Sequence, residues 1–236
     1  MRGAGIAVGV FLLAYAASPW KWKPRWQVAG GLVAAAILVG IGRALGFSWR
    51  DLGLTAGAFR PGSWSTDPGT LGLRLGHLGA GLLECLVYAG LIVAGALIVW
   101  ALLLAARDLG RRQGGASGSS RVARYAFVTL LFGTVVVEEL AFRGVILAAL
   151  TRPRVHLGGI VVSCVLFGLW HLRPERGWTA SQWRRGAWQV VLTTAVAFPL
   201  VLVRLMTSSV VAPAAVHYSV DFIRELVAKR KKRNQG

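Results

Sequence analysis

The sequence predicts an all-α integral membrane protein, a polytopic helical bundle with about seven transmembrane helices. Apolar residues fill 55% of the 236 positions and charged residues only 15%, against roughly 25% charged residues in soluble domains. The apolar residues gather in long runs separated by short basic patches, and the mean hydropathy is +0.58. Such runs of about 20 residues are typical of helices that cross the hydrocarbon core. We therefore expect a single membrane domain over residues 1–236.

The net charge of +18 has an explanation in the membrane. In a soluble protein, this excess would make nucleic acid the first partner to consider. Here the Lys and Arg residues flank the apolar runs, where the positive-inside rule and anionic headgroups account for them. We expect the lipid bilayer as a partner, and no nucleic acid. The two cysteines, Cys85 and Cys164, lie inside apolar runs and indicate neither a disulfide framework nor a metal site.

Seven apolar segments are the candidate spans. The first is short and follows Arg2, so it also has features of a cleaved signal peptide, although we interpret it as a retained first helix. The first three spans form an N-terminal group within residues 1–109. In chain order the candidates are residues 4–18, 27–45, 79–106, 125–150, 157–171, 186–205 and 208–227.

The connecting segments have distinct compositions. Residues 20–26 alternate three tryptophans with three cations, which is typical of an interfacial aromatic belt. Residues 49–70, rich in Gly, Pro, Ser and Trp, are predicted to lie along the outer interface as a loop with a short helix. The Gly/Ser-rich residues 110–120 predict a flexible loop, followed by a core at 121–227. Residues 228–236 are predicted to form a basic cytoplasmic tail.

The distribution of positive charge predicts the orientation in the cell membrane. If the C-terminus is cytoplasmic, the inside segments hold 18 Lys and Arg residues and the outside segments hold eight. This bias favours an outside N-terminus and a cytoplasmic C-terminus.

Polar residues inside the fourth candidate span point to a functional site. Glu138, Glu139 and Arg143 lie near its middle, where each charge costs about 2.5–3.5 kcal/mol on insertion scales. Glu139 and Arg143 are four residues apart, so they face the same side of a helix and are predicted to pair. Glu138 is rotated by about 100° from Glu139 and is the carboxylate that is freer for chemistry. A purely structural clamp is the alternative.

Two later spans add histidines. The fifth ends with Phe167 and His171 on one helical face, and the last carries His217 and Asp221 with the same spacing. Pro213, one turn before His217, is expected to open the local helix ladder. A carboxylate, a His and a His–Asp pair on three helices form a plausible converging site.

These side chains suit hydrolysis. A desolvated Glu can act as a general base on water, a His can share that role or deliver a proton, and a further polar pair can stabilise an oxyanion. Glu, His, His and Asp also suit zinc with an open position for water; in that case Glu138, His171 and His217 are the expected ligands. The residues alone leave both mechanisms open, so no cofactor is assigned.

Three motifs give the chain a resemblance to a known family. They are Glu-Glu-x-x-x-Arg at 138–143, Phe-x-x-x-His at 167–171, and His-x-x-x-Asp at 217–221. In order and spacing they resemble the CPBP family of CAAX-protease and bacteriocin-processing intramembrane proteases, also called the Abi family. Residues 49–54 are similar to a segment that often precedes the core in bacterial members.

The resemblance implies an all-helical membrane fold and cleavage of a peptide bond in a membrane-bound peptide or protein. It further implies that Glu138 and His171 activate water, while His217 and residue 221 support the tetrahedral intermediate and Glu139, Arg143 and Phe167 support the site. Family members have been described as metalloproteases and as glutamic-type enzymes, and we favour the glutamic type.

Asp221 departs from the family pattern, which has Asn at this position. An amide donates hydrogen bonds to an oxyanion, whereas an ionised carboxylate does not. Asp221 therefore is protonated, orients His217 or binds a metal. Other functional classes also remain open: a proton-coupled transporter, a haem protein with His171 and His217 as axial ligands, or a catalytically silent member that acts as a scaffold or immunity factor.

Overall fold

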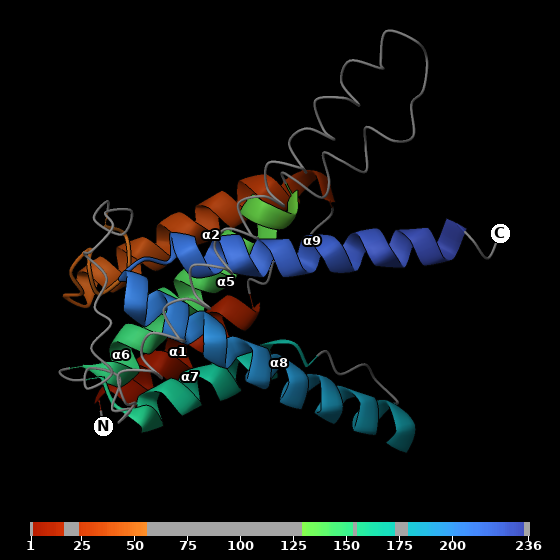
Figure 1. The fold of residues 1–236 in the computed structure, drawn as a ribbon. Helices are drawn as coiled ribbons and strands as arrows, with labels where there is room; N and C mark the ends of the chain where they lie inside the picture. The colour runs from red at the N-terminus through yellow and green to blue at the C-terminus, as the bar shows by residue number, and fades with distance from the viewer. Residues whose placement is uncertain (1, 17–23, 56–128, 153–154, 173–178, 234–236) are drawn as a thin grey trace, which may run out of the picture.

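The computed structural model describes residues 2–16, 24–55, 129–152, 155–172 and 179–233. Every regular element in these residues is helical, and they contain no strand, as expected for the all-α class. Figure 1 shows their arrangement. The predicted span at 79–106, most of the interfacial loop at 49–70 and the predicted loop at 110–120 lie outside the described residues.

The centre of the bundle is an unbroken helix that alternates between α-helical and π-helical (η) turns. It consists of η6 (Leu131–Val135), α5 (Val136–Glu139), η7 (Leu140–Ile146) and α6 (Leu147–Thr151). We call residues 131–151 the motif helix, because it carries the first motif. Every residue from 137 to 149 is buried. Since π-helical turns are rare and occur frequently at functional sites, they single out this helix.

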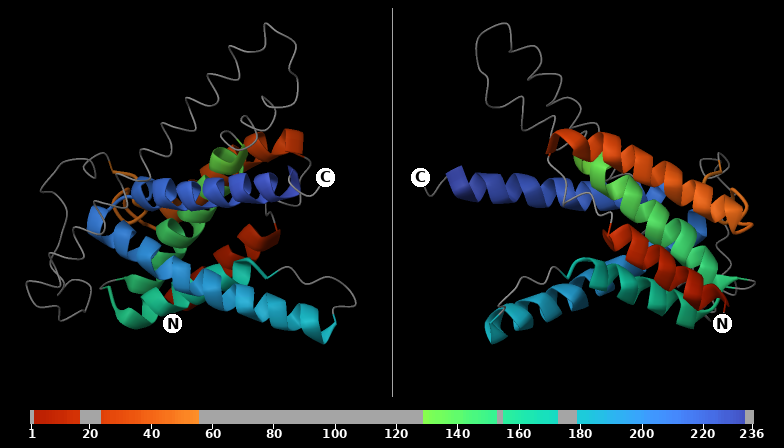
Figure 2. Two further views of the ribbon diagram at one scale, coloured as in Figure 1. Left: turned by 45° about the vertical axis from the view of Figure 1, so that its right-hand side comes forward. Right: turned by 180° about the vertical axis from the view of Figure 1, so that it is seen from behind.

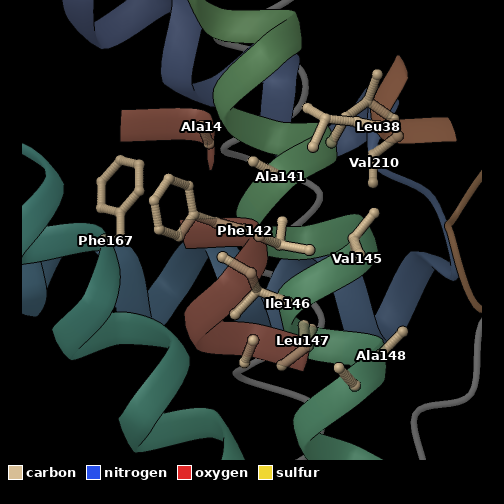
Figure 3. Packing of buried hydrophobic residues seen from close by; sticks show 14 of the residues in the cluster. Ala14, Leu38, Ala141, Phe142, Val145, Ile146, Leu147, Ala148, Phe167 and Val210 are labelled. Atoms are coloured by element: carbon tan, nitrogen blue, oxygen red, sulfur yellow. The ribbon is translucent and has the colours of Figure 1, made fainter. Parts of the chain in front are cut away.

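Two N-terminal helices pack against the motif helix, namely α1 (Arg2–Ala16) and α2 (Pro24–Ala44). A Cβ at Gly31 would collide with the Phe132 carbonyl. Glycine therefore allows the close backbone approach that is typical of helix pairs in membranes. The apolar contacts between these helices form the core shown in Figure 3, where α1 and α2 approach the motif helix from different sides.

The C-terminal helices build the other side of the bundle. Helix α7 (Leu157–Trp170) packs along α8 (Ala180–Thr207), and Ser208, with a left-handed φ of 53°, connects α8 to α9 (Val211–Arg233). In Figures 1 and 2, α8 and α9 diverge with distance from this connection. The ends of these helices differ from the sequence prediction. Helix α8 begins earlier, with a capping box between Thr179 and Gln182, and α9 runs through most of the predicted tail.

The prediction for Pro213 is wrong. Pro213 is the third residue of α9, where an N–H group has no partner within the helix, so proline breaks no hydrogen bond there. Pro199, by contrast, lies inside α8, where it removes one backbone hydrogen bond although the helix continues through it.

Two of the described helices have the length and hydropathy to cross a bilayer, over residues 26–44 and 180–207, while α1 and α7 are shorter apolar helices. Large apolar side chains cover their outward faces, among them Leu32, Ile37, Val162 and Trp188. Such faces suit lipid better than water. These features agree with a helical membrane protein, and the number of seven spans stays a prediction.

Candidate active site

The motif helix holds three charged side chains in the core. Glu138, Glu139 and Arg143 are 2%, 1% and 1% exposed. Burying charges to this extent is unfavourable unless partners compensate them. The contacts of these three side chains therefore define the site.

Two groups offset the buried positive charge of Arg143. Its Nη1 lies 3.1 Å from Oε1 of Glu139, which is the predicted ion pair. Its guanidinium carbon lies 4.0 Å from the centre of the Phe167 ring, a cation–π distance that is favourable for a desolvated arginine. Within the described residues, its nitrogens have no hydrogen-bond acceptor of good geometry, so the carboxylate and the ring are its counterparts.

His217, on α9, lies between the two glutamates. Its Nδ1 is 2.8 Å from Oε1 of Glu139, and its Nε2 is 3.7 Å from Oε2 of Glu138. An ionised carboxylate can only accept a hydrogen bond, so Nδ1 donates to Glu139 and Nε2 faces Glu138. One imidazole therefore lies against both carboxylates, at hydrogen-bond distance from Glu139 and farther from Glu138.

Asp221 lies on the same face of α9 as His217. Its Oδ2 is 3.5 Å from Nε2 of His217, and its Oδ1 is 3.9 Å from Nη1 of Arg224. Of the three roles considered for Asp221, this geometry favours orientation of His217. Nε2 thus faces two carboxylates, one from the motif helix and one from α9.

His171 is the C-cap residue of α7, and its ring packs against Phe167. Its Nδ1 bonds to the Phe167 carbonyl at 2.9 Å, and the Phe167 ring centre is 4.7 Å from the His171 ring and 5.7 Å from the His217 ring. The predicted shared face of Phe167 and His171 is therefore present. In the described part of the chain, no hydrogen bond or ion pair joins His171 to Glu138, so their predicted partnership at one water stays a prediction.

A cavity of about 270 Å³ adjoins these groups. His171, His217 and Asp221 are among its lining residues, and His217 is also in contact with the two glutamates, which do not line the cavity. The other lining residues are mostly apolar and come from α8 and α9. The complete lining is Phe167, His171, Leu192, Thr193, Val196, Pro199, Leu200, Val203, Val216, His217, Val220, Asp221 and Arg224.

The arrangement does not fit the metal site considered from the sequence. Among the described residues, no three His, Cys, Asp or Glu side chains are grouped so that they could hold an ion. The zinc ligand set of Glu138, His171 and His217 is thus not supported, and no step is assigned to a metal.

The comparison with protein families agrees with the motifs. Residues 121–223 match the family model described as type II CAAX prenyl endopeptidase Rce1-like. This segment belongs to the Rce1-like family. The match confirms the predicted membership of the CPBP and CAAX proteases, and the Rce1-like domain contains all three motifs. Comparisons with the curated proteins and with the solved structures gave no match.

Within the Rce1-like domain, one residue of the site was not predicted from the sequence. Trp170 is fully buried, and its Nε1 donates a 2.9 Å hydrogen bond to Oε1 of Glu138. Its ring also packs edge-on against Phe142. The sequence did contain a signal for this contact, because Trp170 directly precedes His171 at the end of an apolar run. The N–H group of a buried indole usually has a hydrogen-bond acceptor.

Proposed function

We propose that the protein is a membrane-embedded endopeptidase that hydrolyses a peptide bond in a membrane-bound peptide or protein. The observation that carries this proposal is the buried Glu138 facing Nε2 of His217 at the border of an apolar cavity. Membership of a family of CAAX endopeptidases supports the reaction class. The apolar walls suit a substrate segment that arrives from the bilayer.

Glu138 is the proposed general base. Trp170 fixes Oε1 by a hydrogen bond, which leaves Oε2 directed toward Nε2 of His217. A water molecule within hydrogen-bond distance of both atoms would be oriented for attack on a carbonyl carbon. Glu138 takes one proton as the C–O bond forms, and general-base assistance of this kind contributes about 10²–10⁴-fold to the rate.

The remaining residues complete the proposed cycle. When the tetrahedral intermediate collapses, the C–N bond breaks and the leaving amine takes up a proton. His171 lines the cavity with Nδ1 occupied by the Phe167 carbonyl, so its Nε2 is available to pass the proton that Glu138 took from water to this amine, which returns Glu138 to its ionised form. Glu139 and Asp221 orient the His217 ring from its two nitrogens, while Arg143 and Phe167 hold Glu139 in place.

Glu138→Gln tests the general base. The amide keeps the shape of the side chain and removes the proton acceptor, so we expect turnover to fall by about 10²–10⁴-fold while folding is retained. The measurement is the cleavage rate of membrane peptides co-reconstituted with each variant in lipid vesicles, with and without a chelator. His171→Ala should cause a comparable loss, and the double variant should be scarcely worse, because residues that act as a unit are not additive.

Trp170→Phe is the matched control for this experiment. It keeps an aromatic ring in the core but removes the hydrogen bond to Glu138, so we expect a loss of only about tenfold. Full activity of Glu138→Gln would refute the assignment. Loss of wild-type activity with the chelator, restored by zinc, would replace the glutamic mechanism with a metal-dependent one.

A further inference from the structure

A short segment outside the Rce1-like domain packs against its core. Residues 49–55, which we call the clasp, follow α2 and its end turn. Leu52 of the clasp is 1% exposed. A Cβ at Gly42 would lie 2.6 Å from the Leu52 side chain, and one at Gly144 would lie 3.3 Å from the Leu52 carbonyl oxygen. The clasp is therefore wedged between α2 and the motif helix.

Arg204, in the last turn of α8, connects the clasp to the motif helix. It is 6% exposed although it lies in an apolar bundle. Its Nη2 donates to the carbonyls of Arg50 and Asp51 at 3.0 and 2.8 Å, and its Nε donates to the carbonyl of Arg143 at 3.2 Å. A guanidinium offers five donors in a rigid plane, so one side chain joins two elements that are distant in sequence.

Gly53 connects the clasp to α9. Its carbonyl accepts a 3.0 Å hydrogen bond from the Val210 backbone N–H, just before α9 begins. Its φ of +73° lies in the left-handed region, and an added Cβ would lie 2.6 Å from Nε of Arg204. Glycine is thus required twice, by the backbone conformation and by the close approach of the guanidinium.

Asp51 fixes the conformation of the clasp independently of Arg204. Its Oδ2 accepts from the backbone N–H and the hydroxyl of Ser48 at 2.7 and 2.6 Å and pairs with Arg152 at 2.6 Å. Although partial burial by itself raises the pKa of Asp51, these hydrogen bonds and the charges of Arg152 and Arg204 lower it below the usual range. Asp51 therefore stays ionised at neutral pH.

The clasp holds the two helices that carry the site. On the motif helix, Arg204 joins the clasp to the carbonyl of Arg143, whose own side chain pairs with Glu139. Next to α9 it holds Val210, which directly precedes the helix and lies about two turns before His217. The 2.8 Å contact between His217 and Glu139 spans these two helices, so the clasp sets their separation.

We propose that Arg204 is a positioning residue which, through Gly53 and the carbonyl of Arg143, sets the distance between His217 and the paired glutamates. Arg204 is not among the residues that line the cavity, and it acts through the backbone of the clasp and of the motif helix. The proposal rests on the proposed peptidase function for its kinetic consequences. Its structural consequence, the His217–Glu139 contact, is measurable without a substrate.

Two glycines provide a matched test. Gly53→Ala places a methyl group against Arg204, whereas Gly46→Ala introduces the same backbone strain at a φ of +78° with nothing within 4 Å. In the purified full chain in lipid nanodiscs, we expect Gly53→Ala to lower kcat about a hundredfold with KM nearly unchanged. Gly46→Ala should match the wild type. Arg204→Lys keeps the positive charge but loses the planar guanidinium, so its kcat should fall as in Gly53→Ala. If Gly53→Ala does not fold, Arg204→Lys provides the test.

The second readout is the Nδ1–H resonance of His217 in histidine-labelled protein, assigned by its loss in His217→Ala. Gly53→Ala and Arg204→Lys should shift this resonance upfield as the bond to Glu139 lengthens, and Gly46→Ala should leave it in place. An unchanged resonance in the two clasp variants, or equal effects of Gly53→Ala and Gly46→Ala, would overturn the proposal. If the wild type cleaves no peptide, the peptidase function fails while the resonance still decides the role of Arg204.

Discussion

Glu139 carries two partners at once, because its Oε1 contacts both Nη1 of Arg143 and Nδ1 of His217. One oxygen atom therefore balances a buried cation and fixes the tautomer of an imidazole. A substitution at Glu139 removes both interactions together. A substitution of Glu139 should therefore lower both the stability of the protein and its turnover. A substitution of Glu138 should lower mainly the turnover.

Arg143→Ala is expected to destabilise the protein by about 3–5 kcal/mol, because it leaves the carboxylate of Glu139 buried without its cation. Arg152→Ala is the matched control, since it also breaks an arginine–carboxylate pair but one in which Arg152 is 46% exposed. That exposed pair contributes less than about 1 kcal/mol. The measurement is the unfolding midpoint of both variants in detergent. Wild-type stability of Arg143→Ala together with weaker substrate binding would show that Arg143 meets the substrate instead.

The short-range contacts of the site were predictable and the long-range ones were not. The Glu139–Arg143 pair and the Phe167–His171 contact follow from a spacing of four residues on one helix. The bond from His217 to Glu139 joins residues 78 positions apart, and no helical periodicity fixes such a distance. The hydrogen bond from Trp170 to Glu138 is of the same long-range kind.

At the scale of the elements, close packing of α7 on α8 sets the position of the second motif. A Cβ at Gly168 would collide with the Thr194 hydroxyl and would lie 2.7 Å from the Val190 carbonyl oxygen. Phe167 and His171 lie on either side of this glycine in sequence. The α7–α8 contact therefore determines where both rings stand relative to α9.

Gly168→Ala is expected to destabilise the protein by about 1–3 kcal/mol through overpacking and to reduce turnover by displacing α7. Gly158→Ala, at the other end of α7, has its nearest neighbour, His156, at an ordinary 3.4 Å and should be neutral. Thermal unfolding and cleavage assays of the two variants provide the comparison. An equal effect at the two positions would mean that the helix–helix distance is not limiting.

The apolar runs of the sequence predict where the helices lie, but they do not predict the π-helical turns or the exact helix ends. Described helices are present at six of the seven predicted segments. The π-helical turns of the motif helix have no periodic signature, because packing on all sides selects them. The ends of α8 and α9 were misplaced, since a hydropathy pattern detects the apolar part of a helix and not its polar extensions.

For the whole molecule, α1 begins and α9 ends at opposite ends of the bundle (Figure 1). The distribution of Lys and Arg predicts that the α9 end faces the cytoplasm. Cysteines introduced at Ser119 and Gln235, both outside the described residues, should then resist an impermeant thiol reagent in intact cells and react after lysis. Labelling of both from outside would reverse the predicted orientation.

Phe167 has a consequence for how the sequence can vary. Its ring packs against the guanidinium of Arg143 and against the imidazoles of His171 and His217. An aliphatic residue could fill the same volume, but it has no π face to offset the buried charge. In related sequences we therefore expect positions 143 and 167 to covary, with an aliphatic residue at 167 only where 143 is no longer arginine. The arginine of the first motif and the phenylalanine of the second would then be kept or lost together.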